Sequence, residues 1–265
     1  MDSLHIVILA IVQGLTEFLP ISSSAHLVLL PQLLNWPEHG LVFDVAVHFG
    51  SLLAVLYYFR DEVRRMLVAW TCSLAGGEAN QDSLLAWWVI IGTLPAVAVG
   101  FLLQDVIEGS LRAPWIVASA SIFFGILLWV VDRKSIRLRD EYELTLKDVL
   151  IIGCSQALAL IPGTSRSGIT ITMALFLGLT RQAAARFSFL LAMPLIFASG
   201  VLQTVRMVTE VNSIGWGELA LGIVLSAASA GLCIHYFLQL VERTGMLPFV
   251  IYRVLLGIVI LLVLY

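Results

Sequence analysis

The sequence predicts an all-α polytopic membrane protein made of two inverted-topology repeats, with about six transmembrane helices and two re-entrant helical hairpins. Of its 265 residues, 60% are hydrophobic and only 12% are charged, whereas roughly 25% are charged in soluble domains. Long apolar segments recur along the whole chain. Each half also contains one apolar stretch that a polar cluster interrupts, and such a pair is the sequence signature of inverted repeats with a binding site between them.

The first interrupted stretch runs from Gln13 to His26 and reads QGLTEFLPISSSAH. Pro20 lacks a backbone N–H and interrupts the preceding helix, and the serines that follow it are good N-cap residues for a second helix. Glu17 and His26 lie here in apolar surroundings. Because a charge at the centre of a bilayer costs roughly 2.5–3.5 kcal/mol, such residues indicate a functional site.

The second interrupted stretch, Gln156–Thr170, has the same design and reads QALALIPGTSRSGIT. An apolar helix is followed by Pro162, by hydroxyl residues around Arg166, and by another apolar helix. We expect the two stretches to be the two halves of one site. Aligning the two prolines pairs Ser22 with Thr164 and Ser23 with Ser165, and a one-residue slip upstream pairs Gln13 with Gln156.

Segment lengths predict the elements in order, because a spanning helix needs roughly 20 apolar residues. Six segments qualify: Leu41–Phe59, Leu84–Leu103, Trp115–Val131, Ala183–Val205, Trp216–Phe237 and Pro248–Tyr265. Four shorter ones form two pairs, Leu4–Phe18 with Ala25–Leu34 and Leu146–Ile161 with Ile169–Leu179. A polar break at membrane depth must be buried in protein or line a wet cavity. We therefore expect two re-entrant hairpins rather than kinked spans.

Charge predicts the orientation. If both hairpins return to the side they enter, one face carries most basic residues: Arg60, Arg64, Arg65, Arg133, Lys134, Arg137, Arg139, Lys147, Arg181, Arg186 and Arg243. The other face keeps Arg112, Arg206, Glu38, Asp105, Glu108 and Glu210. The positive-inside rule makes the basic face cytoplasmic and both termini external. The hydrophilic segment 131–147 places the boundary between repeats 1–139 and 140–265 within a single integral membrane domain, 1–265.

Two classes of function are disfavoured at this point. The net charge of −3, without a basic tail, argues against nucleic acid as a partner. Cys72, Cys154 and Cys233 show no CxxC or Cys/His spacing, so they are interpreted as small apolar fillers rather than metal ligands.

The polar residues of both stretches suit an amphiphilic phosphate ester or anhydride. Arg166 offers a planar fork for bidentate phosphate recognition, glycines allow close backbone approach, and the helix N-termini offer free N–H groups. The substrate-binding residues expected on this basis are Ser22, Ser24, Gly163, Thr164, Ser165, Ser167, Thr170 and His48.

The catalytic residues expected are Ser23, His26, Glu17 and Arg166. Ser23 and His26 lie three residues apart on one helical face, so the imidazole is expected to activate the hydroxyl as a nucleophile. Glu17 and Gln13 lie four apart and can supply oxygen ligands to Mg²⁺ or Ca²⁺. Attack by a metal-bound water, with Ser23 only donating a hydrogen bond, is the competing scheme.

Each assignment has a structural alternative. Serines and threonines beside Pro or Gly often only cap helices, and a buried Glu17–Arg166 pair can be purely structural. At the level of the protein, a lipid-phosphate transporter or flippase shares the inverted-repeat architecture, and a serine with a histidine is compatible with an intramembrane protease. Arg166 within a hydroxyl-rich loop favours phosphate over peptide.

At these motifs the chain resembles the bacitracin-resistance type of undecaprenyl-diphosphate phosphatase. Gln13-Gly-Leu-Thr-Glu17 matches the first motif of that family, Ser22-Ser23-Ser24-Ala25-His26 matches its Ser-Ser-x-x-His element, and Pro162–Thr170 matches PGxSRSxxT. The flanking stretches Phe43–Leu53 and Phe187–Pro194 also resemble the family. Gln13 supplies a neutral amide where many relatives carry a carboxylate.

The resemblance implies hydrolysis of undecaprenyl diphosphate to undecaprenyl phosphate and inorganic phosphate in the bacterial plasma (inner) membrane. This reaction recycles the lipid carrier for peptidoglycan synthesis and confers bacitracin resistance. The expected partners are undecaprenyl diphosphate, the bilayer and bacitracin, which competes for the substrate. A second copy of the chain in a homodimer stays open. The site is expected to open to the outer, periplasmic face.

Overall fold

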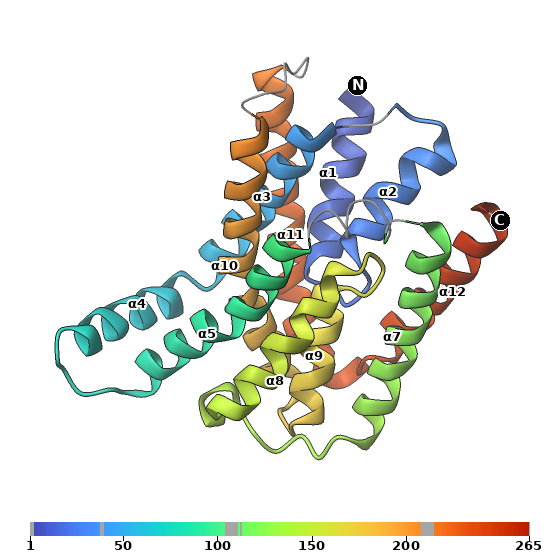
Figure 1. Cartoon of the computed structure of the whole chain (residues 1–265). Coiled ribbons are helices and arrows are strands. Elements are labelled where there is room, and N and C mark those ends of the chain that lie inside the picture. Colours follow the sequence, from blue (N-terminus) through green and yellow to red (C-terminus); the bar gives the residue numbers. More distant parts are fainter. Residues whose placement is uncertain (1–2, 38–39, 104–110, 112, 208–214, 265) are drawn as a thin grey trace.

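The computed structural model describes residues 3–37, 40–103, 111, 113–207 and 215–264. Within them the fold is all-α, with one isolated backbone bridge between Arg139 and Leu179. The helices, shown in Figure 1, are α1 (Ser3–Glu17), α2 (Ser23–Leu34), α3 (Gly40–Tyr58), α4 (Arg60–Leu74), α5 (Gln81–Leu102), α7 (Pro114–Lys134), η1 (Glu141–Glu143), α8 (Leu146–Ala157), η2 (Leu158–Leu160), α9 (Arg166–Phe176), α10 (Arg181–Met207), α11 (Trp216–Thr244) and α12 (Leu247–Leu264).

All six predicted spanning segments form helices, namely α3, α5, α7, α10, α11 and α12. Among the described residues, five of them (all except α12) are long and apolar enough to cross a membrane, and α12 is a shorter apolar helix. Multi-pass membrane character is therefore confirmed, with one clear span fewer than the six expected.

The segment between the predicted spans Leu41–Phe59 and Leu84–Leu103, for which no helix was predicted, forms α4 in its first half. This segment has no glycine before Gly76, so its charged residues continue as an exposed helix rather than as a loop. α4 packs along α5, which begins with a reciprocal capping pair, Asn80 and Ser83. Figure 1 shows α4 and the start of α5 projecting together from the rest of the bundle.

The two predicted hairpins are α1–α2 and α8–α9, and both turn back in the middle of the protein (Figure 1). Their tips touch, since Ser167 Oγ donates to the Leu19 carbonyl at 2.8 Å. α9 begins at Arg166, three residues before the predicted Ile169, because the Ser165 side chain caps it by accepting from the Gly168 N–H at 3.1 Å. Burial of both breaks inside protein satisfies the requirement for irregular backbone at membrane depth.

Helices of the two predicted repeats pack in a similar order, while the repeats themselves stay a prediction. α1 of the first half packs on α11 of the second half, and α8 of the second half packs on α5 of the first half. In the same way, α3 packs on α11 and α10 packs on α5. Ser22 and Ser165 are the N-caps of α2 and α9, with φ of 71° and 68°. The expected alignment of Ser22 with Thr164 is therefore off by one, and a single offset of 143 residues matches both Ser22 with Ser165 and Gln13 with Gln156. The repeat boundary near residue 140 stays a prediction.

One end of the bundle gathers ion pairs between residues of the predicted basic face and nearby carboxylates. Arg181 Nε lies 2.7 Å from Asp132 Oδ1, and Arg139 Nη2 lies 2.7 Å from Asp148 Oδ2. Of the residues predicted for the opposite face, Glu38, Asp105, Glu108, Glu210 and Arg112 lie outside the described residues, as does the side chain of Arg206.

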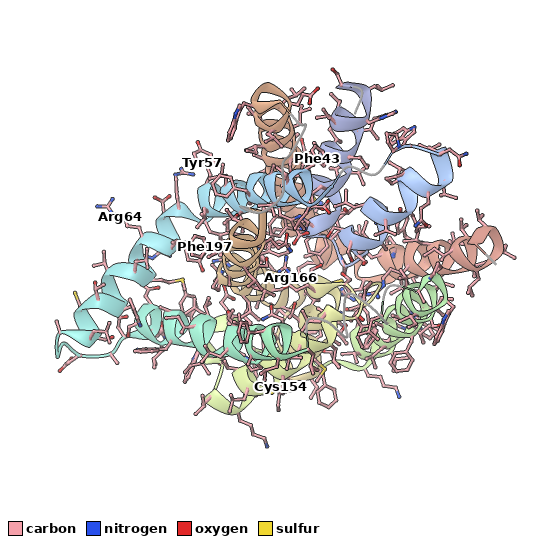
Figure 2. The ribbon with its side chains drawn as sticks, turned by 45° about the horizontal axis from the view of Figure 1, so that its top comes forward. Phe43, Tyr57, Arg64, Cys154, Arg166 and Phe197 are labelled. Carbon is pink, nitrogen blue, oxygen red and sulfur yellow. The ribbon has the colours of Figure 1, made fainter. Side chains whose placement is uncertain are left out.

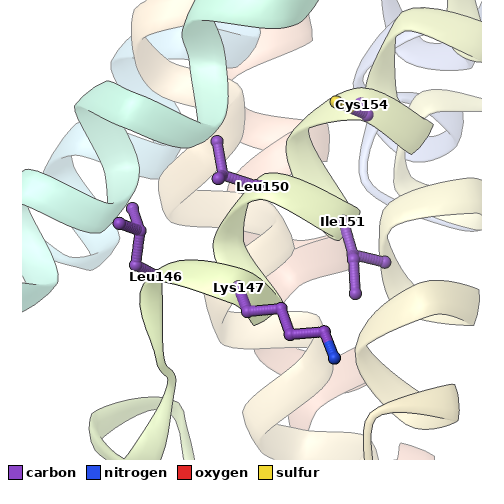
Figure 3. Close-up of a pocket in the computed structure, with 5 residues that line it drawn as sticks. All are labelled: Leu146, Lys147, Leu150, Ile151 and Cys154. Atoms are coloured by element: carbon purple, nitrogen blue, oxygen red, sulfur yellow. The ribbon is translucent and has the colours of Figure 1, made fainter.

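Many large apolar side chains are exposed on the outer faces of the spanning helices, among them Leu94, Phe123 and Val224. Figure 2 shows Arg166 in the interior of the bundle, whereas Tyr57 and Cys154 project outward. A shallow hollow on the outer face of α8 (Figure 3) contains none of the predicted site residues; it is lined by Leu146, Lys147, Leu150, Ile151 and Cys154.

Candidate active site

Glu17, the last residue of α1, is buried and lies at the centre of the polar cluster. Its Oε2 accepts hydrogen bonds from Ser23 Oγ at 2.6 Å and from Gln13 Nε2 at 3.0 Å. Its Oε1 accepts from Arg166 Nη2 at 3.0 Å, and His48 Nε2 on α3 lies 3.7 Å from Oε2. The structure thus brings together five predicted site residues from α1, α2, α3 and α9.

Local structure explains this convergence. Gln13 and Glu17 lie one helical turn apart on α1, which places both side chains on one face. Ser23 and Arg166 are the first residues of α2 and α9, so both helix N-termini, with their positive dipole ends, point toward the Glu17 carboxylate. An anionic group bound near this point would meet the same favourable field.

Arg166 is held inside the protein on two sides. Besides Glu17, its guanidinium donates from Nη1 to the Ser188 carbonyl at 3.2 Å and lies 5.9 Å from the centre of the Phe18 ring. An arginine carries five N–H donors, so donors remain for a phosphate. Ser188 on α10 was not predicted as a site residue.

The expected hydrogen bond between Ser23 and His26 does not form in the described structure. His26 Nδ1 instead bonds the Ser22 carbonyl at 2.7 Å, and Nε2 bonds the Tyr252 hydroxyl at 2.5 Å. Ser23 is drawn to Glu17, because a hydrogen bond to a carboxylate is stronger than one to a neutral group. The group beside the Ser23 hydroxyl is therefore a carboxylate and not an imidazole.

Most hydroxyls of the second motif make hydrogen bonds that hold the loop together, and the substrate-binding role expected of them stays a prediction. Ser165 caps α9, Ser167 bonds Leu19, and Thr170 Oγ1 donates to the Arg166 carbonyl at 2.9 Å. All three hydroxyl residues are buried, and so is Thr164.

In the first motif, Ser22 occupies the N-cap position of α2 without a side-chain cap bond, and its Oγ lies 3.2 Å from that of Ser24. Ser22 is buried, Ser23 is partly exposed and Ser24 is exposed. Of the predicted phosphate-binding groups, Ser24, Arg166 and His48 therefore keep access to a ligand beside Ser23.

The glycines of the second motif allow protein atoms to approach the backbone closely, and the substrate-binding role expected of Gly163 stays a prediction. Gly163 has φ of +92°, and an added Cβ would lie 2.2 Å from the Val117 carbonyl oxygen. At Gly168 an added Cβ would lie 2.7 Å from Nη1 of Arg253. A side chain at Gly163 would push against the backbone of α7, and one at Gly168 would push against the Arg253 guanidinium.

Arg253 on α12 is a residue that sequence reasoning missed. It is fully buried, and its Nη2 donates to the Gly163 carbonyl at 2.9 Å and to the Thr164 carbonyl at 2.7 Å. The signal was present, since a lone arginine within an apolar segment is a charge at membrane depth, as Glu17 is. Arg253 fixes the loop that presents Arg166.

The oxygen atoms of Glu17 and Gln13 are of the kind that a hard divalent cation binds. Gln13 Oε1 is buried without a hydrogen-bond partner among the described residues, and it lies beside a carboxylate. The same part of the chain holds no group of three or more His, Cys, Asp or Glu that suits a metal. Since Mg²⁺ commonly takes one or two carboxylates and completes its shell with phosphate oxygens and water, the protein would supply few of the ligands.

The fold and this site define a polytopic α-helical membrane protein in which two inward hairpins bring a carboxylate, an arginine and a serine into one buried cluster. Residues 6–259 match the family model described as bacitracin resistance protein BacA, and the chain belongs to that family.

The chain is also similar to several proteins over nearly its whole length. The chain is 57% identical over 264 residues to undecaprenyl-diphosphatase 2 of Stutzerimonas stutzeri, covering 98% of each chain. It is 58% identical over 261 residues to undecaprenyl-diphosphatase of Chromohalobacter salexigens, again covering 98% of each. It is 53% identical over 258 residues to undecaprenyl-diphosphatase 1 of Pseudoalteromonas translucida, covering 97% of each.

Proposed function

We propose that this protein hydrolyses undecaprenyl diphosphate to undecaprenyl phosphate and inorganic phosphate. The observation that carries the proposal is the convergence of Ser23 and Arg166, at two helix N-termini, on one buried carboxylate. The full-length similarity to proteins named undecaprenyl-diphosphatase supports the choice of lipid. Such a reaction returns the carrier to peptidoglycan synthesis, and bacitracin resistance follows because the antibiotic competes for the same lipid.

In the proposed reaction Ser23 Oγ attacks the terminal phosphorus and its proton passes to Glu17, 2.6 Å away. The bond from phosphorus to the bridging oxygen breaks, and undecaprenyl phosphate leaves. Water then hydrolyses the phosphoserine, which releases inorganic phosphate and restores the hydroxyl. Arg166 binds the equatorial oxygens and stabilises the charge that develops on them. Glu17 replaces His26 as the proton acceptor expected from the sequence.

A divalent cation, Mg²⁺ or Ca²⁺, is part of the proposal, held by Glu17 and by the unpartnered Oε1 of Gln13. Bound there, it would neutralise charge on the diphosphate.

Phosphate release by detergent-solubilised protein is the first test, because no bilayer remains to cross and a transporter would release none. Ser23→Ala is expected to lose several orders of magnitude in kcat, as other nucleophile deletions do. Ser24, the exposed neighbour of Ser23, provides the matched comparison, and Ser24→Ala is expected to lose less than about tenfold in kcat. Rapid quenching with terminally ³²P-labelled substrate should yield labelled protein. A Ser23→Ala enzyme with more than a tenth of wild-type activity and no labelled protein would favour direct attack by water.

We place the protein in the bacterial inner membrane with the site open to the periplasmic face and both termini outside. Two positions test this in a cysteine-free background. Ser3→Cys lies at the start of α1, and Lys134→Cys lies at the end of α7 on the basic face. A membrane-impermeant thiol reagent added to intact cells is expected to label position 3 and spare position 134. The reverse pattern would invert the orientation. A homodimer stays an expectation from the sequence.

A further inference from the structure

Tyr252 on α12 contacts the first half-site from a position 226 residues away along the chain. Its hydroxyl lies 2.5 Å from His26 Nε2, and the two rings stack with centroids 5.5 Å apart and planes inclined by 11°. The neighbouring Arg253 bonds the Gly163 and Thr164 carbonyls of the other half-site. Two consecutive residues of α12 therefore hold both hairpin tips.

The hydrogen bonds of His26 define where its proton lies. The Ser22 carbonyl can only accept, so His26 Nδ1, 2.7 Å away, must donate. In the neutral ring Nε2 is then an acceptor, and the Tyr252 hydroxyl donates to it. The hydrogen bond from the Tyr252 hydroxyl to Nε2 thus keeps the proton on Nδ1 and supports the hydrogen bond that Nδ1 donates to the Ser22 carbonyl.

The recipient of that donation is a strained residue. Ser22 has φ of 71° and ψ of 91°, and its own side chain makes no capping bond. Residues other than glycine persist in such conformations only where the surroundings hold them. The bond from His26 is the contact that holds the Ser22 carbonyl, and Ser22 directly precedes Ser23, whose hydroxyl faces Glu17.

We propose that Tyr252 is a positioning residue for the reaction, acting through His26 and the Ser22 carbonyl to hold Ser23 against Glu17. The inference rests on the proposed function of the site. Tyr252 makes no hydrogen bond to Ser23 or Glu17 among the described residues, so we expect its hydroxyl to act through His26 and to change kcat more than KM.

Tyr252→Phe removes the hydroxyl and keeps the ring stack. The variant is expected to lose about tenfold in kcat, or about 1.4 kcal/mol in the barrier, with KM nearly unchanged. Tyr236→Phe is the matched control, since Tyr236 is an exposed tyrosine of α11 whose hydroxyl makes no hydrogen bond within the described part of the chain. It is expected to keep wild-type kcat and KM.

A double-mutant cycle separates this role from a packing role. In a His26→Ala background, Tyr252→Phe is expected to cause no further loss. His26→Asn, which keeps an amide donor where Nδ1 lies, is expected to retain more activity than His26→Gln, which places its amide where Nε2 lies. An equal loss from Tyr252→Phe in both backgrounds, or no loss in the wild-type background, would overturn the proposal.

A second measurement does not depend on turnover. ¹⁵N spectra of histidine-labelled protein, assigned with His26→Asn, are expected to show His26 as the Nδ1–H tautomer, with its Nε2 signal shifted in Tyr252→Phe. An Nε2–H tautomer in the wild type would contradict the proposal even if phosphate release were normal. Normal spectra in a protein that releases no phosphate would instead refute the proposed function alone.

Discussion

At the scale of single residues, Glu17 must be stable as a buried carboxylate and must also be able to accept a proton from Ser23. A buried carboxylate is costly unless it is paired and hydrogen-bonded, and here Arg166, Gln13 and Ser23 satisfy both of its oxygens. The same bonds place the Ser23 hydroxyl at the only carboxylate of the described cluster, which suits it to accept a proton.

Glu17→Gln keeps the shape of the side chain and removes its charge. We expect phosphate release to fall by at least about 10²-fold, because an amide is neither a proton acceptor nor an adequate partner for Arg166. After chelation, the midpoint for reactivation by Mg²⁺ or Ca²⁺ should also rise, and by more than in Gln13→Ala, since only the carboxylate carries charge. An unchanged metal titration in Glu17→Gln would leave Glu17 with a structural role.

At the scale of elements, both hairpins rely on helices that approach closely at glycine. On α1, a Cβ added to Gly14 would lie 2.0 Å from Ser229 Oγ of α11. On α8, a Cβ added to Gly153 would lie 2.5 Å from the Gly92 carbonyl oxygen of α5. Each of these contacts holds a hairpin against a long helix.

Gly14→Ala and Gly153→Ala should each lower the free energy of unfolding by about 1–3 kcal/mol, because the helices must separate to admit a methyl group. Gly200→Ala is the control: no atom lies within 4 Å of its added Cβ, and alanine favours a helix by up to about 1 kcal/mol over glycine. Thermal unfolding in detergent measures all three. Equal melting temperatures in the three variants would contradict the role of close packing.

At the scale of the whole molecule, Arg186 of α10 connects separate elements at the end of the bundle where the ion pairs gather. Its Nε donates to Glu141 Oε1 at 2.5 Å and its Nη2 to Glu62 Oε2 at 2.6 Å. Burial raises the pKa of Glu62 above its ordinary value, and Arg186 opposes that rise. The guanidinium therefore pairs with two neighbouring carboxylates where α4, η1 and α10 meet.

Arg186→Met is expected to destabilise the protein by about 3 kcal/mol near pH 8, because it leaves buried carboxylates unpaired. The loss should shrink toward pH 5. A carboxyl whose folded pKa is raised binds its proton more tightly in the folded state, so lowering the pH relieves the penalty. Arg64→Met, at an exposed arginine that projects outward in Figure 2, is the control without a pH-dependent change. Thermal unfolding in detergent at both pH values checks the prediction. An equal loss of stability in Arg186→Met at the two pH values would contradict it.

The sequence by itself determined the membrane class, the helix pairs and the group of residues that meet. Polar and charged residues in apolar segments avoid lipid, so Gln13, Glu17 and Ser23 were expected to meet Arg166 from the other hairpin inside the protein. Periodicity and composition carry this information because they depend on solvent preference alone. The same argument missed α4, where a charged segment is still helical.

Only the tertiary structure decided which atoms are bonded within that group. Ser23 and His26 share a helical face, yet the hydroxyl bonds Glu17 and the imidazole bonds Tyr252. A choice between such partners depends on side-chain direction and on distances of a few tenths of an ångström, which spacing along the chain does not encode. For the same reason Tyr252 and Arg253 became visible only once α12 had packed beside both hairpin tips.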